Sequence, residues 1–184
     1  MLRLFVGIPV PGECREALAG AVRALAEAAG EGLRPTRPEN FHLTLQFLGE
    51  TPDDRVAAVA DALAAVVFSP FILRPGPVGC LPDCRRPRVI HAGAALGGEE
   101  CAALAGRVRD ATAPLGYPRG NQFTPHLTLA RIKRPGGVDW RVLTAGFPAA
   151  LPAFSVDRFV LWRSELTPAG PIYTPLRAYL PAAP

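Results

Sequence analysis

The sequence His-Leu-Thr-Leu occurs twice in the chain, at residues 42–45 and again at residues 126–129. The chain contains three histidines in all, so two of them belong to this repeat. Core packing would preserve the leucines and leave the polar positions free to vary. The repeated histidine and threonine therefore indicate a chemical role rather than a packing role.

Two imidazoles and two hydroxyls suit the hydrolysis of a phosphodiester. Because the ordinary pKa of histidine is about 6.5, one ring can be neutral and the other charged near neutral pH. One imidazole can then take a proton from the attacking water while the other gives a proton to the leaving oxygen. The hydroxyls can donate hydrogen bonds to the non-bridging oxygens, whose charge must be stabilised in the transition state. The two identical motifs do not tell which histidine is the donor.

Neither copy of the motif carries a complete set of metal ligands. The carboxylates nearest to His42 are Glu39 and Glu50, and a metal site would need a third protein ligand beside the histidines. We therefore expect a reaction without a metal or any other cofactor. A metallohydrolase remains an alternative, which activity after exhaustive chelation would remove.

Both motifs lie in segments that alternate as strands, predicted at 41–48 and 126–132. The two-residue period of a strand sends the histidine and threonine to one face and the leucines to the other. Strict alternation also places Phe47 with the leucines, and Gln46 and Leu48 with His42. In the second copy it places Arg131 on the face opposite His126, unless the strand ends or twists there.

The remaining elements follow from apolar periodicity and from turn residues. Further strands are predicted at 2–8, 71–78, 88–93, 154–164 and 172–180. Helices are predicted at 13–29, from residue 51 onward, at 99–115 and at 139–146. Thr51 is the expected cap of the second helix, with Pro52 at its first position.

The order of these elements in residues 1–80 recurs in residues 85–165, and a final strand follows at 171–181. We therefore expect an α+β protein and one two-lobed domain over residues 1–184. The predicted fold is a bilobal duplication, in which two similar lobes of antiparallel sheet, flanked by helices, surround a central groove. No glycine-rich phosphate loop follows the first strand, which argues against a dinucleotide-binding fold.

Composition indicates a folded protein with a mildly basic surface. The 184 residues are 49% hydrophobic, and 20 Lys+Arg against 16 Asp+Glu give a net charge of +4. That charge permits an anionic partner such as RNA but is too small to mark a dedicated nucleic-acid-binding protein. The N-terminus lacks the pattern of a signal peptide and no apolar stretch is long enough to cross a bilayer, so we expect a cytoplasmic protein without membrane contact.

The cysteines match neither a redox motif nor a paired zinc knuckle. We predict free thiols in a reducing compartment at all four positions. These are Cys14, Cys80, Cys84 and Cys101.

With its repeated His-Leu-Thr-Leu motif, the chain resembles the two-histidine phosphoesterases. Within them it is similar to the RNA 2′,3′-cyclic phosphodiesterases formerly described as 2′-5′ RNA ligases. The resemblance covers nearly the whole chain and includes residues 3–6, 38–50, 123–131, 161–166 and 170–173. The family often has a tryptophan at the position of His91, which we predict to be a structural or surface residue here.

The resemblance implies hydrolysis of a terminal 2′,3′-cyclic phosphate to a 2′-phosphomonoester. By the same analogy His42 is the proton donor, His126 is the proton acceptor, Thr44 and Thr128 hold the phosphate, and Arg131 lies near the substrate. The expected partner is RNA with a cyclic phosphate end or a small cyclic nucleotide, bound by a monomer. Joining of RNA halves through a 2′-5′ bond, and RNA-end binding without turnover, are the alternatives.

Overall fold

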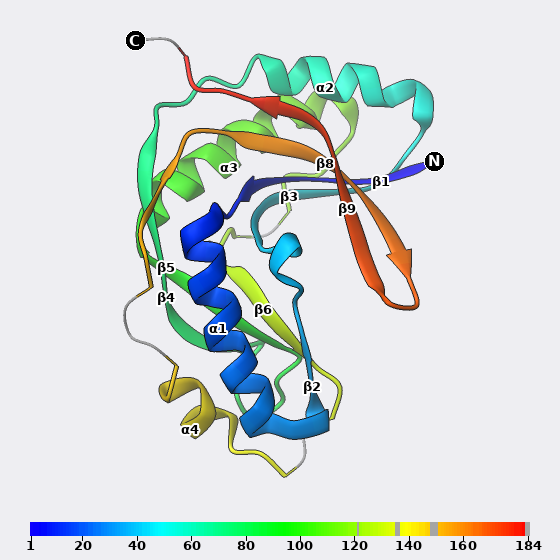
Figure 1. The fold of residues 1–184 in the computed structure, drawn as a ribbon. Coiled ribbons are helices and arrows are strands. Elements are labelled where there is room, and N and C mark those ends of the chain that lie inside the picture. The colour runs from blue at the N-terminus through cyan, green and yellow to red at the C-terminus, as the bar shows by residue number, and fades with distance from the viewer. Residues whose placement is uncertain (121, 135–136, 148–150, 183–184) are drawn as a thin grey trace.

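One curled antiparallel sheet organises the molecule, with helices packed against it (Figure 1). The computed structural model describes residues 1–120, 122–134, 137–147 and 151–182. Within these residues the sheet has nine strands in the order β7-β4-β5-β6-β3-β1-β8-β9, and β2 also pairs with β6. The predicted α+β class, with two lobes of antiparallel sheet, is confirmed.

Lobe one contains the half of the sheet that begins at β3. Its strands are β3 (His42–Thr51), β1 (Leu2–Pro9), β8 (Phe159–Thr167) and β9 (Gly170–Tyr179). Its helices are α2 (Val56–Ala64) and α3 (Gly98–Thr112), which pack against each other, and α3 packs on β3. Leu4, Val6 and Ile8 of β1 are buried in the core beneath this half of the sheet.

Lobe two contains the half of the sheet that begins at β6. Its strands are β6 (Leu127–Ile132), β5 (Val89–Leu96), β4 (Phe71–Leu81), β7 (Phe154–Val156) and β2 (Leu33–Pro35). Its helices are α1 (Gly12–Ala29), which packs against β2 and β6, and α4 (Trp140–Ala145), which packs against α1 and β4. Short 3-10 turns occur at Gly30–Gly32, Pro38–Asn40, Asp53–Arg55 and Ala113–Leu115.

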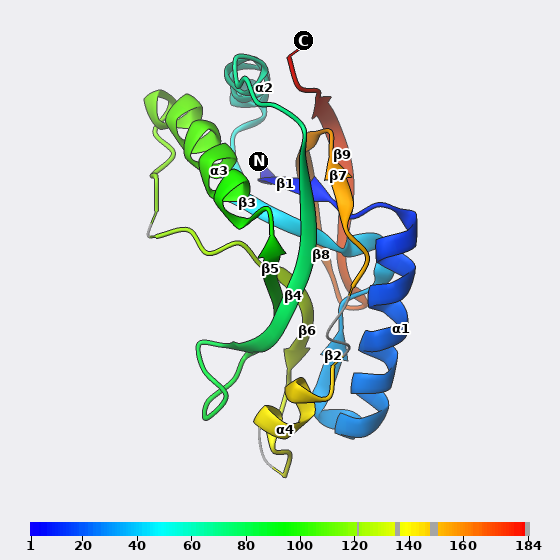
Figure 2. The same cartoon turned by 90° about the vertical axis from the view of Figure 1, so that its left-hand side faces the viewer.

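The two halves of the chain exchange elements between the lobes. Strand β4 and helix α1 come from the first half of the chain but belong to lobe two, whereas β8 and α3 come from the second half and belong to lobe one. Figure 2 shows α1 and α3 on opposite sides of the molecule. None of the helices in the described part of the chain has the length and apolar character needed to cross a bilayer.

Two local predictions were wrong. The segment 154–164, predicted as one strand, is divided by the exposed ion pair Asp157–Arg158 into β7 and β8, which pair with β4 and β1 respectively. Thr51 does not cap a helix but ends β3, where its hydroxyl accepts a hydrogen bond from Tyr117 at 3.0 Å. The three residues of β2 are too short for a periodic signal, and no strand was predicted there.

The prediction of four free thiols was wrong for one pair. Cys80 and Cys84 form a disulfide at the turn between β4 and β5, whereas Cys14 and Cys101 are free and buried. The turn brings the α-carbons of the pair to 5.1 Å, inside the range that a disulfide spans.

Candidate active site

His42 is the first residue of β3, and its ring is oriented by the backbone just before the strand. Its Nδ1 lies 2.7 Å from the carbonyl oxygen of Asn40. Because a carbonyl oxygen only accepts, Nδ1 carries the hydrogen and the neutral ring keeps its lone pair on Nε2. The Asn40 side chain donates in turn to the carbonyl of Pro171 at 2.9 Å, which ties this turn to β9.

His126 repeats the same geometry in lobe two. Its Nδ1 lies 2.9 Å from the carbonyl oxygen of Thr124, again two residues earlier in the chain. The two copies of the motif therefore fix the same tautomer, and each imidazole retains Nε2 for proton transfer.

The two motifs meet where the lobes join. Leu43 of β3 pairs with Leu127 of β6 in an antiparallel register. In such a pair the adjacent residues also face each other, which places His42 opposite Thr128 and Thr44 opposite His126. All four polar side chains lie on the face opposite the buried leucines, as predicted.

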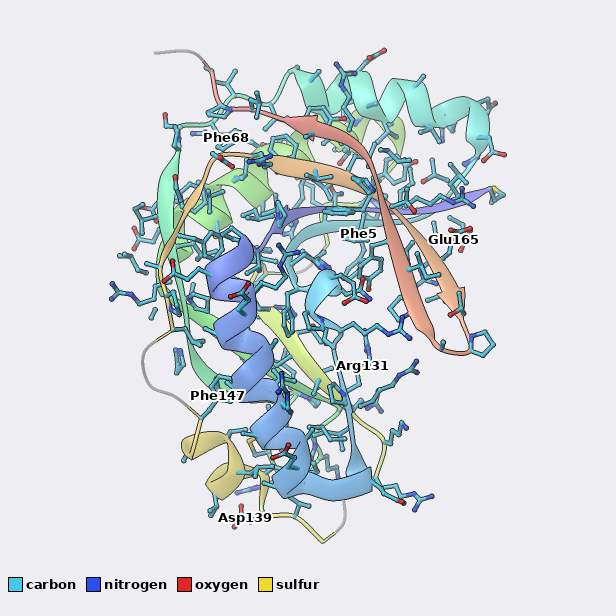
Figure 3. All side chains as sticks on the ribbon, in the orientation of Figure 1. Phe5, Phe68, Arg131, Asp139, Phe147 and Glu165 are labelled. Carbon is cyan, nitrogen blue, oxygen red and sulfur yellow. A yellow bond between two sulfur atoms is a disulfide. The ribbon has the colours of Figure 1, made fainter. Side chains whose placement is uncertain are left out.

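A cavity of about 380 Å³ opens on this face of the sheet. His42, Thr44, Thr128 and Arg131 are among the residues that line it, whereas His126 lies outside its lining. Phe5 of β1 and Arg131 of β6, labelled in Figure 3, contribute to it from the two lobes. The structure thus brings the predicted residues to one place, with the cavity extending from the His42 side.

A repeated β-bulge explains why Arg131 reaches the cavity. His91 pairs with Thr128 but Ile90 pairs with Ala130, so Leu129 is an extra residue in β6. Such an insertion reverses the alternation of the side chains that follow. Arg131 therefore lies on the same face as Thr128, although strict alternation predicted the opposite face.

The first copy of the motif contains the same bulge. Gly7 pairs with Thr44 but Val6 pairs with Gln46, which leaves Leu45 as the extra residue in β3. The prediction for the end of this strand was wrong for this reason. Phe47 is 70% exposed and lines the cavity, whereas Gln46 is buried and accepts a hydrogen bond from Thr112 at 2.8 Å.

Comparison with known families agrees with this arrangement. The family described as LigT like Phosphoesterase matches residues 8–91 and 96–173. The chain belongs to the LigT-like phosphoesterase family. The predicted resemblance to the two-histidine phosphoesterases, and the expectation of an enzyme of that class, are confirmed.

Relatives of this LigT-like phosphoesterase match over nearly its whole length. The RNA 2′,3′-cyclic phosphodiesterase of Archaeoglobus fulgidus is 34% identical over 97% of this chain and 99% of the relative. The crystal structure of TT0787 of Thermus thermophilus has a TM-score of 0.77 at 33% identity, covering 97% of each chain. That of Escherichia coli LigT complexed with 3′-AMP has a TM-score of 0.81 at 27% identity, covering 99% of each chain.

His42 of this LigT-like phosphoesterase is enclosed by aromatic rings. Its ring centroid lies 4.7 Å from that of Phe5 and 5.2 Å from that of Tyr173. The pKa of His42 is lowered to about 4, chiefly by burial; the hydrogen bond to Asn40 opposes this shift and the charge of His126 adds to it. In the free protein His42 is therefore neutral near pH 7.

His91 was predicted to be structural or on the surface, but the structure places it beside His126. Their ring centroids are 5.8 Å apart in an edge-to-face arrangement. Burial and then the charge of His126 lower the pKa of His91. Its Nδ1 is buried without a hydrogen-bond partner among the described residues. His91 pairs with Thr128 of β6 as Gly7 pairs with Thr44 of β3. His91 and Gly7 therefore occupy equivalent positions beside the two motifs.

Several cavity residues were not predicted from the sequence. Arg3, Arg34, Arg37 and Tyr173 line the cavity with the predicted residues. Arg34 and Arg37 precede the first tetrapeptide, and no acidic residue lies between the two arginines. This local positive charge is the feature of the sequence that could have indicated their place in the cavity.

Proposed function

We propose that this LigT-like phosphoesterase hydrolyses the 2′,3′-cyclic phosphate of an RNA end or nucleotide to a 2′-phosphomonoester. The observation that carries the proposal is the pair of imidazoles held in one tautomer on either side of the Leu43–Leu127 pair. Relatives named RNA 2′,3′-cyclic phosphodiesterase support the choice of substrate.

The proposed reaction is an attack of water on phosphorus with loss of the 3′ oxygen. His126 accepts the proton of the attacking water at Nε2, and His42 donates a proton from Nε2 to the departing 3′ oxygen. The bond between phosphorus and the 3′ oxygen breaks as the new bond to the water oxygen forms. Thr44 and Thr128 donate hydrogen bonds to the non-bridging oxygens, and the charge of Arg131 stabilises the phosphate.

The role of His42 as donor requires a proton that the free protein does not hold near neutral pH, because the pKa of this ring is about 4. An anionic phosphodiester beside the ring favours the imidazolium and so raises this pKa. We therefore expect His42 to become protonated when the substrate binds, with one proton taken up from the solvent as the complex forms.

The proposal includes catalysis without a metal. Among the described residues no group of three or more His, Cys, Asp or Glu side chains is placed to hold a metal ion. Activity that persists after exhaustive chelation would support this part of the proposal, and loss of activity restored by one added metal would contradict it.

The test uses nucleoside 2′,3′-cyclic phosphates and oligonucleotides with cyclic ends, with chromatography that separates 2′- from 3′-phosphate products. We expect 2′-phosphate only, and a loss of at least about 10²-fold in kcat for His42→Ala and for His126→Ala. The matched control is Arg55→Gln, an exposed arginine outside the cavity.

Full activity in the double alanine variant would refute the mechanism. A product joined through a 2′-5′ bond would instead indicate a ligase, and binding of cyclic ends without any product would indicate a binding module.

A further inference from the structure

The rings of the two motif histidines are held by different surroundings. Each ring is tied at Nδ1 to a carbonyl two residues earlier, but the bond of His42 is partly buried and that of His126 is exposed to solvent. His42 also contacts the rings of Phe5 and Tyr173. Within the described part of the chain, the aromatic ring that contacts His126 is that of His91. The orientation of His126 therefore depends on His91 more than that of His42 depends on any single neighbour.

One exposed hydrogen bond is a weak constraint on an imidazole. Water competes for the carbonyl of Thr124, and a bond at Nδ1 leaves the ring free to tilt about that atom, which moves Nε2. A general base must lie within about 3 Å of the proton that it takes, and a displacement of about 1 Å can lower the rate by about 10²-fold. A second contact is therefore needed to fix His126 for proton transfer.

The strand register brings His91 to the side of His126. His91 of β5 pairs with Thr128 of β6, and directly opposed residues of antiparallel strands have their side chains on one face of the sheet. His126 lies two residues before Thr128 and belongs to the same face. The rings of His91 and His126 meet edge to face, with their centroids 5.8 Å apart and their planes at 81°. In this favoured arrangement each ring restricts the tilt of the other.

Strand β4 supports His91 from the other side. Gly79 of β4 pairs with His91, and an added β-carbon at Gly79 would lie 3.5 Å from Nε2 of His91. The ring therefore lies over the backbone of β4, with room for no more than one further carbon between them. Because the ring of His91 lies between β4 and His126, it cannot move away from His126, and the sheet itself holds the imidazole in place.

The stability of the sheet does not account for His91. Its Nδ1 is buried without a hydrogen-bond partner among the described residues, and such an atom lowers stability. The equivalent position in the other lobe is Gly7, so the duplicated sheet does not require a ring there. At Gly7 the backbone of β1 lies against His42, since an added β-carbon would come 3.3 Å from Cδ2 of that ring. His91 thus gives His126 the contact that β1 and Phe5 give His42.

His91 is suited to this place because it is neutral. Burial and then the charge of His126 lower its pKa, so His91 carries no charge near neutral pH. A neutral ring does not repel the imidazolium that forms when His126 takes up a proton. The flat, neutral ring of phenylalanine should therefore be able to replace it.

We propose that His91 is a positioning residue, whose ring holds the imidazole of His126 with Nε2 directed toward the attacking water. The inference rests on the proposed function, in which His126 is the proton acceptor. His91 is not among the residues that line the cavity, so it acts on catalysis through His126. Its loss should therefore lower kcat and leave KM nearly unchanged.

The kinetic test compares His91→Ala and His91→Phe with the unmodified protein, on adenosine 2′,3′-cyclic phosphate. We expect kcat to fall by about tenfold or more in His91→Ala, with KM within about twofold, and to recover to within about threefold in His91→Phe. The matched control is Phe71→Ala, which removes a half-buried ring of β4 outside the cavity. It should lower the melting temperature and leave kcat unchanged.

The second test observes the ring of His126 without substrate. Long-range proton–nitrogen NMR spectra at alkaline pH show which ring nitrogen carries the hydrogen, and single variants assign the three histidines of the chain. We expect the hydrogen of His126 on Nδ1 in the unmodified protein and in His91→Phe. In His91→Ala the two tautomers should exchange, so that the two ring-nitrogen resonances of His126 move toward each other while those of His42 stay unchanged. A merely structural role of His91 would not move these resonances.

Unchanged kcat, or unchanged resonances of His126, in His91→Ala would each overturn the inference while leaving the proposed function intact. Equal losses of kcat in His91→Ala and His91→Phe would also overturn it, because a neutral ring would then not suffice. If circular dichroism shows that His91→Ala does not fold, His91→Leu, which fills the space without a flat ring, replaces it with the same expectations. Absence of hydrolysis by the unmodified protein would instead refute the proposed function, and the NMR comparison would then decide whether His91 holds the ring.

Discussion

At the residue scale, two identical tetrapeptides have acquired different surroundings. His42 lies against Phe5 and Tyr173, whereas His126 lies against His91. The motif itself fixes only the tautomer, through the carbonyl two residues before each histidine. The difference between the two imidazoles must therefore come from residues outside the motif, which is why the repeat alone did not distinguish donor from acceptor.

His42 should make the stability of the protein depend on pH. Its pKa is about 4 in the folded protein and about 6.5 when unfolded. Between pH 4 and pH 6.5 the imidazole of residue 42 therefore carries a proton in the unfolded chain but not in the folded protein. Above pH 6.5 this ring does not lower the free energy of unfolding. As the pH falls from 6.5 to 4 the free energy of unfolding decreases, by roughly 3 kcal/mol at most.

Urea unfolding at several pH values between 7.5 and 4 measures this effect. His42→Gln should lose less stability than the unmodified protein over this range, because other titrating groups are common to both. Identical pH dependence in the two proteins would show that the ring is not desolvated as described.

His91→Phe should leave stability unchanged or raise it by about 1 kcal/mol. The substitution removes a buried nitrogen that lacks a partner among the described residues and keeps a ring of similar size beside His126. Denaturant unfolding of the two proteins measures the difference. A loss of more than about 1 kcal/mol would mean that Nδ1 is hydrogen-bonded in solution, for example to water.

At the element scale, periodicity predicted the strands that carry the motifs and the face that His42 and Thr44 share. Periodicity could not predict which face of the sheet the side chains after Leu45 occupy. A bulge leaves no mark in the sequence here, since the extra residues Leu45 and Leu129 are ordinary strand residues. Strict alternation therefore put Phe47 and Arg131 on the wrong face, although the family resemblance had placed Arg131 near the substrate, and both side chains line the cavity.

Gly7 of β1 leaves no room for a methyl group beside His42. A β-carbon there would lie 2.9 Å from the carbonyl oxygen of Leu43 and 3.3 Å from Cδ2 of His42. Because β1 and β3 would have to separate, Gly7→Ala should lower both kcat/KM, by about tenfold or more, and the melting temperature. The measurements are steady-state kinetics and thermal unfolding.

The control for this substitution is Gly20→Ala, in the middle of α1, where an added β-carbon meets nothing within 4 Å. It should keep full activity and gain up to about 1 kcal/mol of helix stability. Unchanged kinetics in Gly7→Ala would show that the ring of His42 can shift without cost.

At the scale of the whole molecule, the repeated order of elements was visible in the sequence but the exchange between lobes was not. Strand pairing joins residues far apart in the chain, so local patterns do not say which lobe receives β4 or β8. In the structure β4 pairs with β5 and β7, and β8 pairs with β1 and β9. Each lobe is therefore completed by a strand from the other half of the chain.

Division of the chain in the exposed turn between Arg85 and Arg86 should give two fragments that do not fold separately. The first fragment lacks both partners of β4, and the second lacks the β1 partner of β8. Mixed together, the fragments should restore circular dichroism and activity. A cooperative thermal transition in either fragment alone would contradict the predicted single domain over residues 1–184.

The one-sided placement of the arginines gives the site a polarity. The tetrapeptides are related by an approximate half-turn, so by themselves they would accept a cyclic ester in two opposite poses. The cavity with its four guanidinium groups includes His42 and leaves out His126. The four guanidinium groups on the His42 side break that symmetry, and we expect them to favour one pose of a bound phosphodiester and therefore one departing oxygen.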